Sequence, residues 1–225
     1  MKKAIDTIWE RIHETYSFGE YPTEHVIRFV ARNYYNERNR KNIKILDFGC
    51  GAGAHTWYLA REGFNTYAFD GSPSAVEKTK ARLQQNGLEA SLSVQDAVSI
   101  DYSENFFDAV IDNVCIYSNK MADINAMYRN IYRVLKRGGK LLSVCFGEKL
   151  DGYKTGKQVE DGTYVDIKEG ILVNRGCSHL FTKFEIKQTL ENNGFSDVQI
   201  DWCKYSDRGY LVHQYICTAE KQKED

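Results

Sequence analysis

The sequence has little proline and no excess of charge of either sign. Two prolines in 225 residues argue against long proline-rich linkers or extended arms. Thirty Lys and Arg residues against 31 Asp and Glu residues leave a formal charge of −1. The chain therefore lacks the basic excess that binding to a phosphate backbone requires, and we expect no nucleic-acid partner.

Long apolar runs are absent as well. The longest stretch without Asp, Glu, Lys or Arg is Phe48–Ala60, which contains three glycines, whereas a membrane span needs about 20 apolar residues. A secretory signal would follow Lys2 and Lys3 with an apolar segment, but acidic residues come next. The sequence thus predicts no membrane association and a cytoplasmic location.

Cysteine occurs six times, but never as a Cys-x-x-Cys pair. This scattered spacing fits neither a zinc site nor a small disulfide framework. We expect reduced, mostly buried thiols and no bound metal.

The first forty residues predict a pair of helices. Apolar side chains recur at helical spacing in the first of them: Ile5, Ile8, Trp9 and Ile12. This spacing predicts an amphipathic helix over residues 4–14. The Gly and Pro of the stretch Tyr16–Pro22 would end it, and Thr23 suits the N-cap of a second helix. Residues 1–40 are thus expected to form a helical cap.

Residues 41–225 predict a domain in which strand-like runs alternate with helices. The strand-like runs are 43–46, 66–69, 91–94, 108–111 and 140–146, and the helical segments are 57–61, 74–85 and 124–135. Such alternation predicts a parallel sheet with helices on both faces. Glycines stand where these helices should stop, at Gly63, at Gly87 and at the pair Gly138 and Gly139. We expect each to be a C-terminal cap residue with positive φ.

The chain after residue 146 interrupts this alternation. Residues 147–177 contain β-like pieces at 163–167 and 171–174, which predict an inserted hairpin that could act as a lid. A capping box, Thr182 to Glu185, then opens another helix.

Two final strand-like runs, 198–202 and 210–218, are joined by a short loop and can only pair antiparallel. The sequence therefore predicts an α/β fold with a doubly wound, mostly parallel seven-stranded sheet whose last strand is antiparallel. A single structural domain carries both the cap and the insertion.

The most informative segment is ILDFGCGAG, Ile45–Gly53. Glycines between a strand and a helix let the backbone approach a ligand closely, and the helix N-terminus offers free N–H groups. A nucleotide is the expected ligand. The segment also satisfies the dinucleotide fingerprint, but Asp47 would place a negative charge beside a pyrophosphate. An acidic residue there suits a ligand with an ammonium or sulfonium group better.

Together with later motifs, this segment resembles the class I S-adenosylmethionine-dependent methyltransferases from Ile43 onward. The resemblance implies that Asp70 accepts hydrogen bonds from the ribose, that Asp96 and Ala97 hold the adenine, and that Asn113 helps to hold the methionine end. The family's fourth strand and the loop after it are similar to FFDAVIDNVCIYS (residues 106–118). The family's fifth strand and the helix before it are similar to IYRVLKRGGKLLSV (residues 131–144). The implied residues for S-adenosylmethionine, or its product S-adenosylhomocysteine, are Asp47, Gly49, Cys50, Gly51, Asp70, Gly71, Ser72, Asp96, Ala97 and Asn113.

The acceptor side is less defined by the sequence. Ser118 stands about where many small-molecule members have a histidine, and the Asp-Pro-Pro-Tyr type of signature is missing. His179, at the end of the insertion, is the candidate catalytic base, with a purely structural role as the alternative. A base is optional for methyl transfer. Further candidates for the acceptor pocket are Tyr16, Phe18, Tyr21, His25 and Tyr117.

The resemblance implies a methyltransferase that acts on an oxygen or nitrogen atom of a small molecule. Three alternatives remain: a methyltransferase acting on RNA or protein, a dinucleotide oxidoreductase, and a non-catalytic module that binds S-adenosylmethionine. The identity of the acceptor and the oligomeric state do not follow from the sequence.

Overall fold

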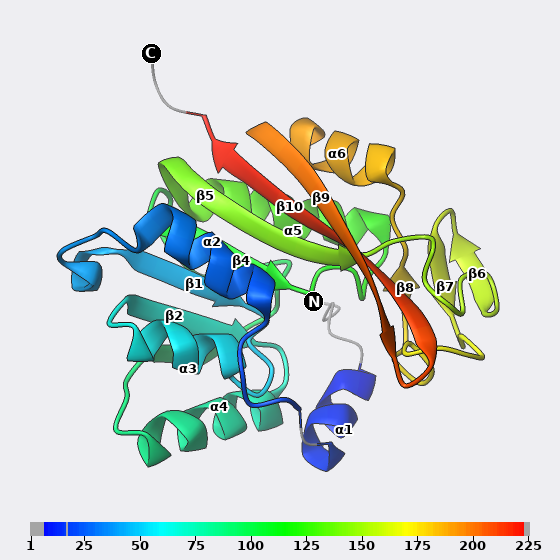
Figure 1. Ribbon diagram of the computed structural model, residues 1–225, viewed down its shortest axis with the longest axis horizontal. Helices are drawn as coiled ribbons and strands as arrows, with labels where there is room; N and C mark the ends of the chain where they lie inside the picture. The colour runs from blue at the N-terminus through cyan, green and yellow to red at the C-terminus, as the bar shows by residue number, and fades with distance from the viewer. Residues whose placement is uncertain (1–6, 17, 223–225) are drawn as a thin grey trace.

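The protein is built around a seven-stranded sheet in the order β3-β2-β1-β4-β5-β10-β9 (Figure 1). The computed structural model describes residues 7–16 and 18–222. The strands are β1 (Lys44–Phe48), β2 (Asn65–Asp70), β3 (Ser91–Val94), β4 (Phe107–Asn113), β5 (Leu135–Phe146), β9 (Phe195–Asp207) and β10 (Tyr210–Lys221). Strands β1 to β5 are parallel, whereas β10 is antiparallel to both of its neighbours. The predicted fold class is confirmed.

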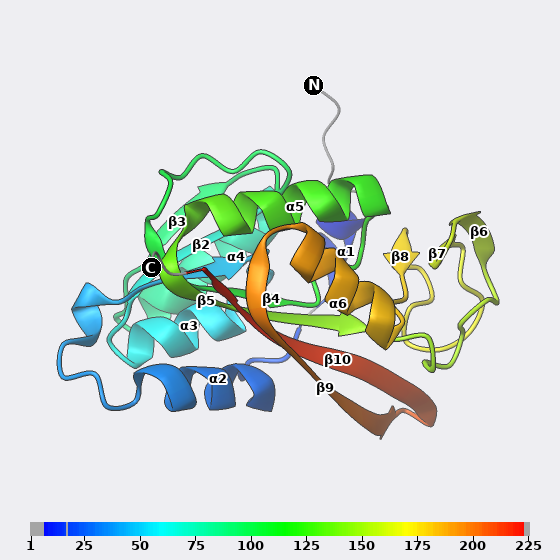
Figure 2. The same ribbon diagram turned by 90° about the horizontal axis from the view of Figure 1, so that it is seen from above.

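Helices cover both faces of the sheet (Figure 2). They are α1 (Thr7–Thr15), α2 (Glu24–Tyr34), α3 (Ala54–Arg61), α4 (Pro73–Gln85), α5 (Met121–Val134) and α6 (Lys183–Asn192), with a short 3₁₀ turn, η1 (Arg40–Asn42). Helices α5 and α6 lie on one face, and α2 and α3 lie on the other. The start of the predicted first helix, before residue 7, falls outside the described residues.

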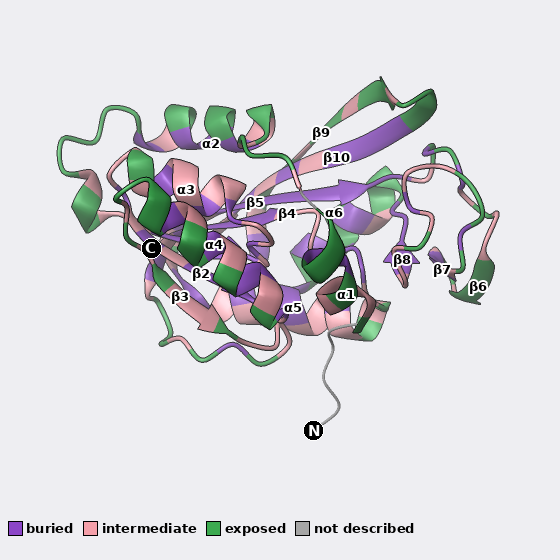
Figure 3. Ribbon diagram, turned by 90° about the horizontal axis from the view of Figure 1, so that it is seen from below, coloured by how far each residue is buried: buried purple, intermediate pink, exposed green. Residues whose placement is uncertain are grey.

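Successive buried side chains of the central strands pack on opposite faces of the sheet. Ile45 on β1 packs in the cluster formed with α2 and α3, and the next residue, Leu46, packs on the opposite side with α5. Ile111 and Val110 on β4 divide in the same way. A strand that is apolar on both faces is typical of a parallel sheet covered on both sides, and the buried central strands are visible in Figure 3.

The helix caps are set locally by sequence. Thr182 and Glu185 form the predicted capping box of α6, with both reciprocal hydrogen bonds present. Thr23 precedes α2 as predicted, but its side chain does not cap the helix. Its Oγ1 atom instead donates to Oδ1 of Asn113 at 3.2 Å, which links the cap to the end of β4.

The predicted role of the Gly-Gly pair as a helix cap is wrong. The first strand residue, Leu135, follows α5 directly, so Gly138 and Gly139 lie within β5. Gly138 has a positive φ, but Gly139 does not. A Cβ at Gly139 would lie 2.7 Å from the Lys136 carbonyl oxygen, so close backbone approach accounts for the second glycine.

The insertion contains a hairpin, but not between the predicted pieces. Strand β6 (Lys157–Glu160) pairs with β7 (Thr163–Val165), and β8 (Ser178–His179) pairs with β7. Residues 171–174 form a turn instead of a strand, and Leu172 within it is buried. The flanking glycines, Gly170 and Gly176, both have positive φ and fold this short apolar run back on the protein.

Several separate segments meet where the strands β1, β2 and β4 end. Helix α1, the small sheet β6-β7-β8 and the tip of the β9–β10 hairpin all lie toward this edge in Figure 1. Ligands of open α/β sheets bind outside the carboxyl ends of the strands, so this edge is where a site is expected. Across residues 7–16 and 18–222, no helix is both long and apolar enough to cross a bilayer.

Candidate functional site

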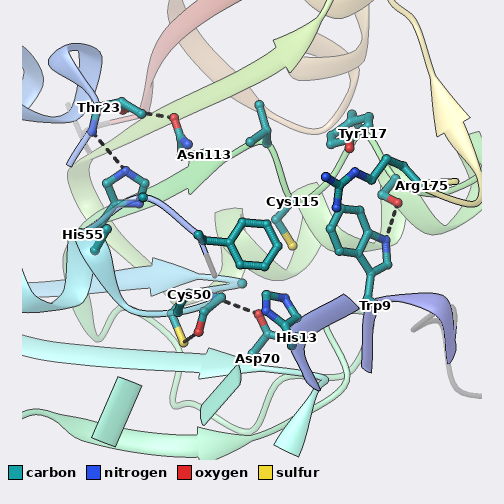
Figure 4. A pocket seen from close by; sticks show the side chains of 18 of the residues that line it. Trp9, His13, Thr23, Cys50, His55, Asp70, Asn113, Cys115, Tyr117 and Arg175 are labelled. Carbon is teal, nitrogen blue, oxygen red and sulfur yellow. Dashed lines mark hydrogen bonds between the residues drawn. The ribbon is translucent and has the colours of Figure 1, made fainter. Parts of the chain in front are cut away.

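A cavity of about 470 Å³ opens at the carboxyl edge of the parallel strands (Figure 4). Its size lies in the range of small-molecule sites. The glycine turn after β1 and the loop after β4 form its floor, and α1, the following loop, the insertion and the β9–β10 tip enclose it. The cavity therefore combines the sheet edge with segments that are far apart in the sequence.

The glycine turn contributes to this floor at positions where a side chain would meet neighbouring groups. Gly49 and Gly51 both have positive φ, and a Cβ at Gly49 would lie 2.7 Å from the Cβ of Cys115. The backbone N–H of Cys50 donates to the Phe69 carbonyl at 2.9 Å, which holds the turn against the end of β2. Gly49, Cys50 and Gly51 all line the cavity.

Asp70 lies at the end of β2 and faces the same cavity. One carboxylate oxygen accepts the N–H of Gly51 at 2.9 Å, and the other accepts the N–H of Ser72 at 2.9 Å. The side chain is 9% exposed, and each oxygen keeps a further lone pair for a ligand donor. This carboxylate is thus fixed in place as an acceptor at the mouth of the turn.

Asp47 is placed differently from the sequence interpretation. Its side chain is buried, lies outside the cavity lining and accepts the Thr56 hydroxyl at 2.6 Å. Burial raises the pKa of Asp47, an effect that nearby His55 and the Thr56 hydrogen bond oppose. Asp47 therefore links the end of β1 to α3, and the expected direct contact with a cationic ligand does not follow from its position.

The residues expected around the nucleoside divide into two groups. Gly71 and Ala97 line the cavity, whereas Asp96 and Ser72 do not. Asp96 accepts the backbone N–H of Val98 at 3.1 Å. Ser72 accepts the N–H of Ala75 at 3.1 Å as the N-cap of α4. Ser72 is therefore a structural residue in this arrangement, and Ala97, next to Asp96, reaches the cavity.

The loop after β4 brings further expected residues to the cavity. Asn113 and Tyr117 line it, together with Cys115. Asn113 is held by Thr23, and the backbone N–H of Thr23 also donates to Nε2 of His55 at 3.4 Å. These bonds attach the cap segment to the end of the sheet.

Only some of the cap residues expected in the acceptor pocket line the cavity. Phe18 and Tyr21 line the cavity. Tyr16 lies outside the lining and is 59% exposed. His25 is also outside, and its Nε2 atom lies 3.7 Å from Sγ of Cys203. The cap thus contributes its aromatic loop to the cavity, but not its second helix.

His179 is not positioned as a catalytic base. Its side chain is fully buried and does not line the cavity. The ring nitrogens are both engaged, Nδ1 with the Thr163 hydroxyl at 2.6 Å and Nε2 with Glu185 at 3.2 Å. His179 therefore joins β8 to α6, and the structural alternative accounts for its place in the sequence.

Several cavity residues were not identified from the sequence, and Trp9, His13 and Arg175 are among them. Trp9 and His13 project from α1, and Arg175 projects from the insertion, as Figure 4 shows. The Trp9 ring N–H donates to the Ser118 hydroxyl at 2.7 Å, and that hydroxyl donates to the Cys177 carbonyl at 3.0 Å. This chain of bonds ties α1, the β4 loop and the insertion together. Helical spacing indicated an apolar face at Trp9, but no local signal marked Arg175.

His13 lies directly over the glycine turn. Its ring is 6% exposed, its Nδ1 atom has no hydrogen-bond partner among the described residues, and its Cε1 atom would lie 3.3 Å from a Cβ at Gly51. Burial lowers the pKa of His13, and the nearby Asp70 charge opposes this shift. The imidazole is therefore held in its neutral form at neutral pH.

Comparisons with known proteins agree with this geometry. A family model described as a methyltransferase domain matches residues 45–139. An uncharacterised methyltransferase of Synechocystis is 32% identical over 43% of this chain and 43% of that protein. A ubiquinone biosynthesis O-methyltransferase of Rickettsia prowazekii is 30% identical over 54% of this chain and 49% of that protein. The matched stretches thus span less than half of these two curated relatives.

The likeness of fold extends further than the likeness of sequence. A solved SAM-dependent methyltransferase from Methanosarcina mazei superposes with a TM-score of 0.71 and 22% identity. The match covers 80% of this chain and 93% of that one. The family match covers the glycine turn and Asp70, and the strand order extends the shared architecture to the antiparallel end of the sheet. Residues 45–139 thus match the methyltransferase domain family, within a sheet that has the fold of the solved SAM-dependent methyltransferase.

Proposed function

We propose that the protein transfers a methyl group from S-adenosylmethionine to an oxygen or nitrogen atom of a small molecule. The observation that carries this proposal is the cavity in which the glycine turn and Asp70 face residues of the cap and of the insertion. A ligand bound to the turn would lie next to space enclosed by these added segments. The R. prowazekii relative named as an O-methyltransferase supports a small acceptor.

The residues present fit S-adenosylmethionine. Asp70 offers fixed carboxylate oxygens to the ribose hydroxyls, and the turn Gly49–Gly51 offers a backbone surface without side chains. Ala97 and Asn113 line the cavity on either side of this turn along the sheet edge, where the resemblance places the adenine and the methionine ends. When bound, S-adenosylmethionine supplies a methyl group on a positively charged sulfur, which is already a good leaving group.

The chain's own contribution is then largely orientation and exclusion of water. Holding two reactants in line is worth about 7–11 kcal/mol, which requires no catalytic base. The aromatic side chains of Trp9, Phe18 and Tyr117 enclose the cavity, and such rings can also attract a cationic sulfur. His13 supplies a neutral imidazole beside the turn, which can accept a proton from an acceptor hydroxyl or ammonium.

We propose that residues 1–40 act as a cap and residues 147–177 as a lid, and that they determine which acceptor binds. The cap supplies Phe18 and Tyr21 to the cavity, and the lid supplies Leu172 and Arg175. The core residues of the sheet edge are assigned to S-adenosylmethionine, so the added segments are left to form the acceptor pocket.

A labelling experiment tests the proposed function. The protein is incubated with S-adenosylmethionine labelled on the methyl group and with a cell extract divided into small molecules and macromolecules. We expect label in the small-molecule fraction, and its loss with Asp70→Ala. Label only in protein or RNA would contradict a small acceptor. Binding of S-adenosylmethionine without transfer to either fraction would favour the non-catalytic module.

A further inference from the structure

Arg175 is a positively charged side chain inside a cavity whose walls are mostly apolar. It lines the cavity together with Leu172 and Ile171 of the lid, and Figure 4 shows it on the same side of the cavity as Tyr117 and Trp9. Transfer of a charged group into apolar surroundings is costly unless the charge is paired. Arg175 is half-buried at this wall, so an anionic partner in the protein or in the ligand would stabilise its charge.

No protein carboxylate takes the role of partner among residues 7–16 and 18–222. The cavity is lined by two acidic residues, Asp70 and Asp207. Asp70 is held by backbone N–H groups of the glycine turn and α4, and Asp207 lies 3.6 Å from Arg208 at the cavity rim. The charge of Arg175 instead lies 5.5 Å from the centre of the Tyr16 ring. Its side chain donates no hydrogen bond within residues 7–16 and 18–222, so its N–H groups can serve an anion.

Contacts within the protein hold the turn that carries Arg175. The N–H of Arg175 donates to the Leu172 carbonyl at 3.2 Å, and Asn174 adopts the left-handed conformation that this turn requires. Two residues further on, the Cys177 carbonyl accepts the Ser118 hydroxyl. Arg175 is therefore positioned by the same contacts that attach the lid to the β4 loop.

The charge of Arg175 at the cavity wall acts on neighbouring titratable groups. Burial raises the pKa of the Tyr117 hydroxyl, and the charge of Arg175 acts in the opposite direction. Burial lowers the pKa of His13, and Arg175 is among the positive charges that lower it further. Arg175 thus acts on side chains from both the β4 loop and α1.

We propose that Arg175 binds an anionic group, a carboxylate or a phosphate, of the methyl acceptor, whose remaining part is apolar. This inference rests on the proposed function, because it assigns the space beyond the glycine turn to the acceptor. The planar guanidinium suits both anions, since it can donate two parallel hydrogen bonds to either of them. The apolar walls formed by Phe146, Leu172 and Trp9 suit the body of such an acid.

Binding of matched ligand pairs tests the proposal. Wild-type protein, with and without saturating S-adenosylhomocysteine, is titrated by calorimetry with 2-naphthoate, indole-3-acetate and phenyl phosphate, and with 2-naphthamide, indole-3-acetamide and phenol. We expect at least one anion to bind at least tenfold more tightly than its neutral counterpart. Preference for the two carboxylates or for phenyl phosphate identifies the anion. Equal binding of anions and neutral compounds, or no binding of any anion, would overturn the proposal.

The variant Arg175→Gln and a matched control distinguish the possible roles of the arginine. Lys154→Gln removes an exposed positive charge that lies 5.0 Å from the Tyr153 ring in the same insertion, outside the cavity lining. We expect Arg175→Gln to weaken anion binding at least tenfold and Lys154→Gln to change it less than twofold. Affinity for S-adenosylhomocysteine should change less than threefold in both variants.

Two results would assign Arg175 a different role. A loss of S-adenosylhomocysteine affinity in Arg175→Gln, with the anion preference retained, would mean that the arginine binds the methionine carboxylate. A fall in melting temperature of the ligand-free variant, with the anion preference retained, would mean that it only packs on Tyr16. Failure of the wild type to bind S-adenosylhomocysteine would refute the proposed function, and the titrations without that ligand would still report on Arg175.

Discussion

Replacement of Asp70 by alanine removes the acceptor on which the account of the site depends. In the ligand-free protein, its two oxygens accept the N–H groups of Gly51 and Ser72 at 2.9 Å each. A hydrogen bond to a charged group contributes about 1.5–3 kcal/mol. Asp70 is only 9% exposed, so water can replace only part of the two lost hydrogen bonds in the variant. We therefore expect the free energy of unfolding to fall by about 2–4 kcal/mol.

The same replacement should weaken ligand binding independently of its effect on stability. Loss of one charge-assisted hydrogen bond to the ribose corresponds to a drop in affinity of roughly 10- to 100-fold. Asp70→Asn should lose less, since the amide oxygen still accepts one hydrogen bond while its NH₂ group opposes a second donor. Calorimetry with S-adenosylhomocysteine measures the affinity, at a temperature where circular dichroism shows each variant folded.

A control separates this effect from a general change of charge. Asp161 is exposed at the turn between β6 and β7 and does not line the cavity, so Asp161→Ala should bind S-adenosylhomocysteine like the wild type. An affinity of Asp70→Ala within threefold of the wild type would refute the assignment of Asp70 to the ribose. Loss of affinity in both variants would show that net charge, and not this carboxylate, is responsible.

Three further outcomes follow from the same geometry. Gly51→Val should abolish binding of S-adenosylhomocysteine, while circular dichroism shows that the fold is retained. The control Gly63→Val, which is also at positive φ but faces open space, should bind the ligand normally. Equal binding by both variants would place the ligand elsewhere. Burial lowers the pKa of His13, so below about pH 6.5 the unfolded chain binds more protons than the folded protein, and the free energy of unfolding falls. In urea titrations, His13→Asn should lose less stability between pH 7.5 and pH 5.5 than the wild type loses. An equal or larger loss in the variant would contradict this. In hydrogen exchange, residues 16–24 and 147–177 should gain protection with S-adenosylhomocysteine and acceptor together, and protection confined to the loops after β1, β2 and β3 would argue against the cap and lid.

The fold could be predicted closely because its signals are local. Strands such as Ser91–Val94 and helices such as α4 follow from the alternation of apolar runs with helical periods, bounded by glycines. The parallel pairing of β1 to β5 follows from the crossover helices, and the antiparallel pairing of β9 with β10 follows from the short loop before β10. The Gly138–Gly139 pair was misassigned because a positive φ and a close backbone approach both select glycine, and sequence does not distinguish them.

The site could be predicted only in part. Asp70 and Asn113 are the last residues of β2 and β4. They could be predicted to reach the cavity because the end of a strand fixes their place. Whether a side chain faces the cavity or the layer below depends on packing from distant segments, so Asp47 was assigned to the ligand although Thr56 holds it underneath. His13 and Arg175 meet at the cavity only through tertiary contacts, which leave no periodic pattern in the sequence.

A crystal structure of the protein grown with saturating S-adenosylhomocysteine tests the central claim most directly. The account predicts the ligand in the cavity at the carboxyl edge of β1, β2 and β4, with its ribose hydroxyls within hydrogen-bonding distance of the Asp70 carboxylate and its chain lying against the Gly49–Gly51 backbone. Ligand density at another place on the protein, or a ribose turned away from Asp70, would contradict it.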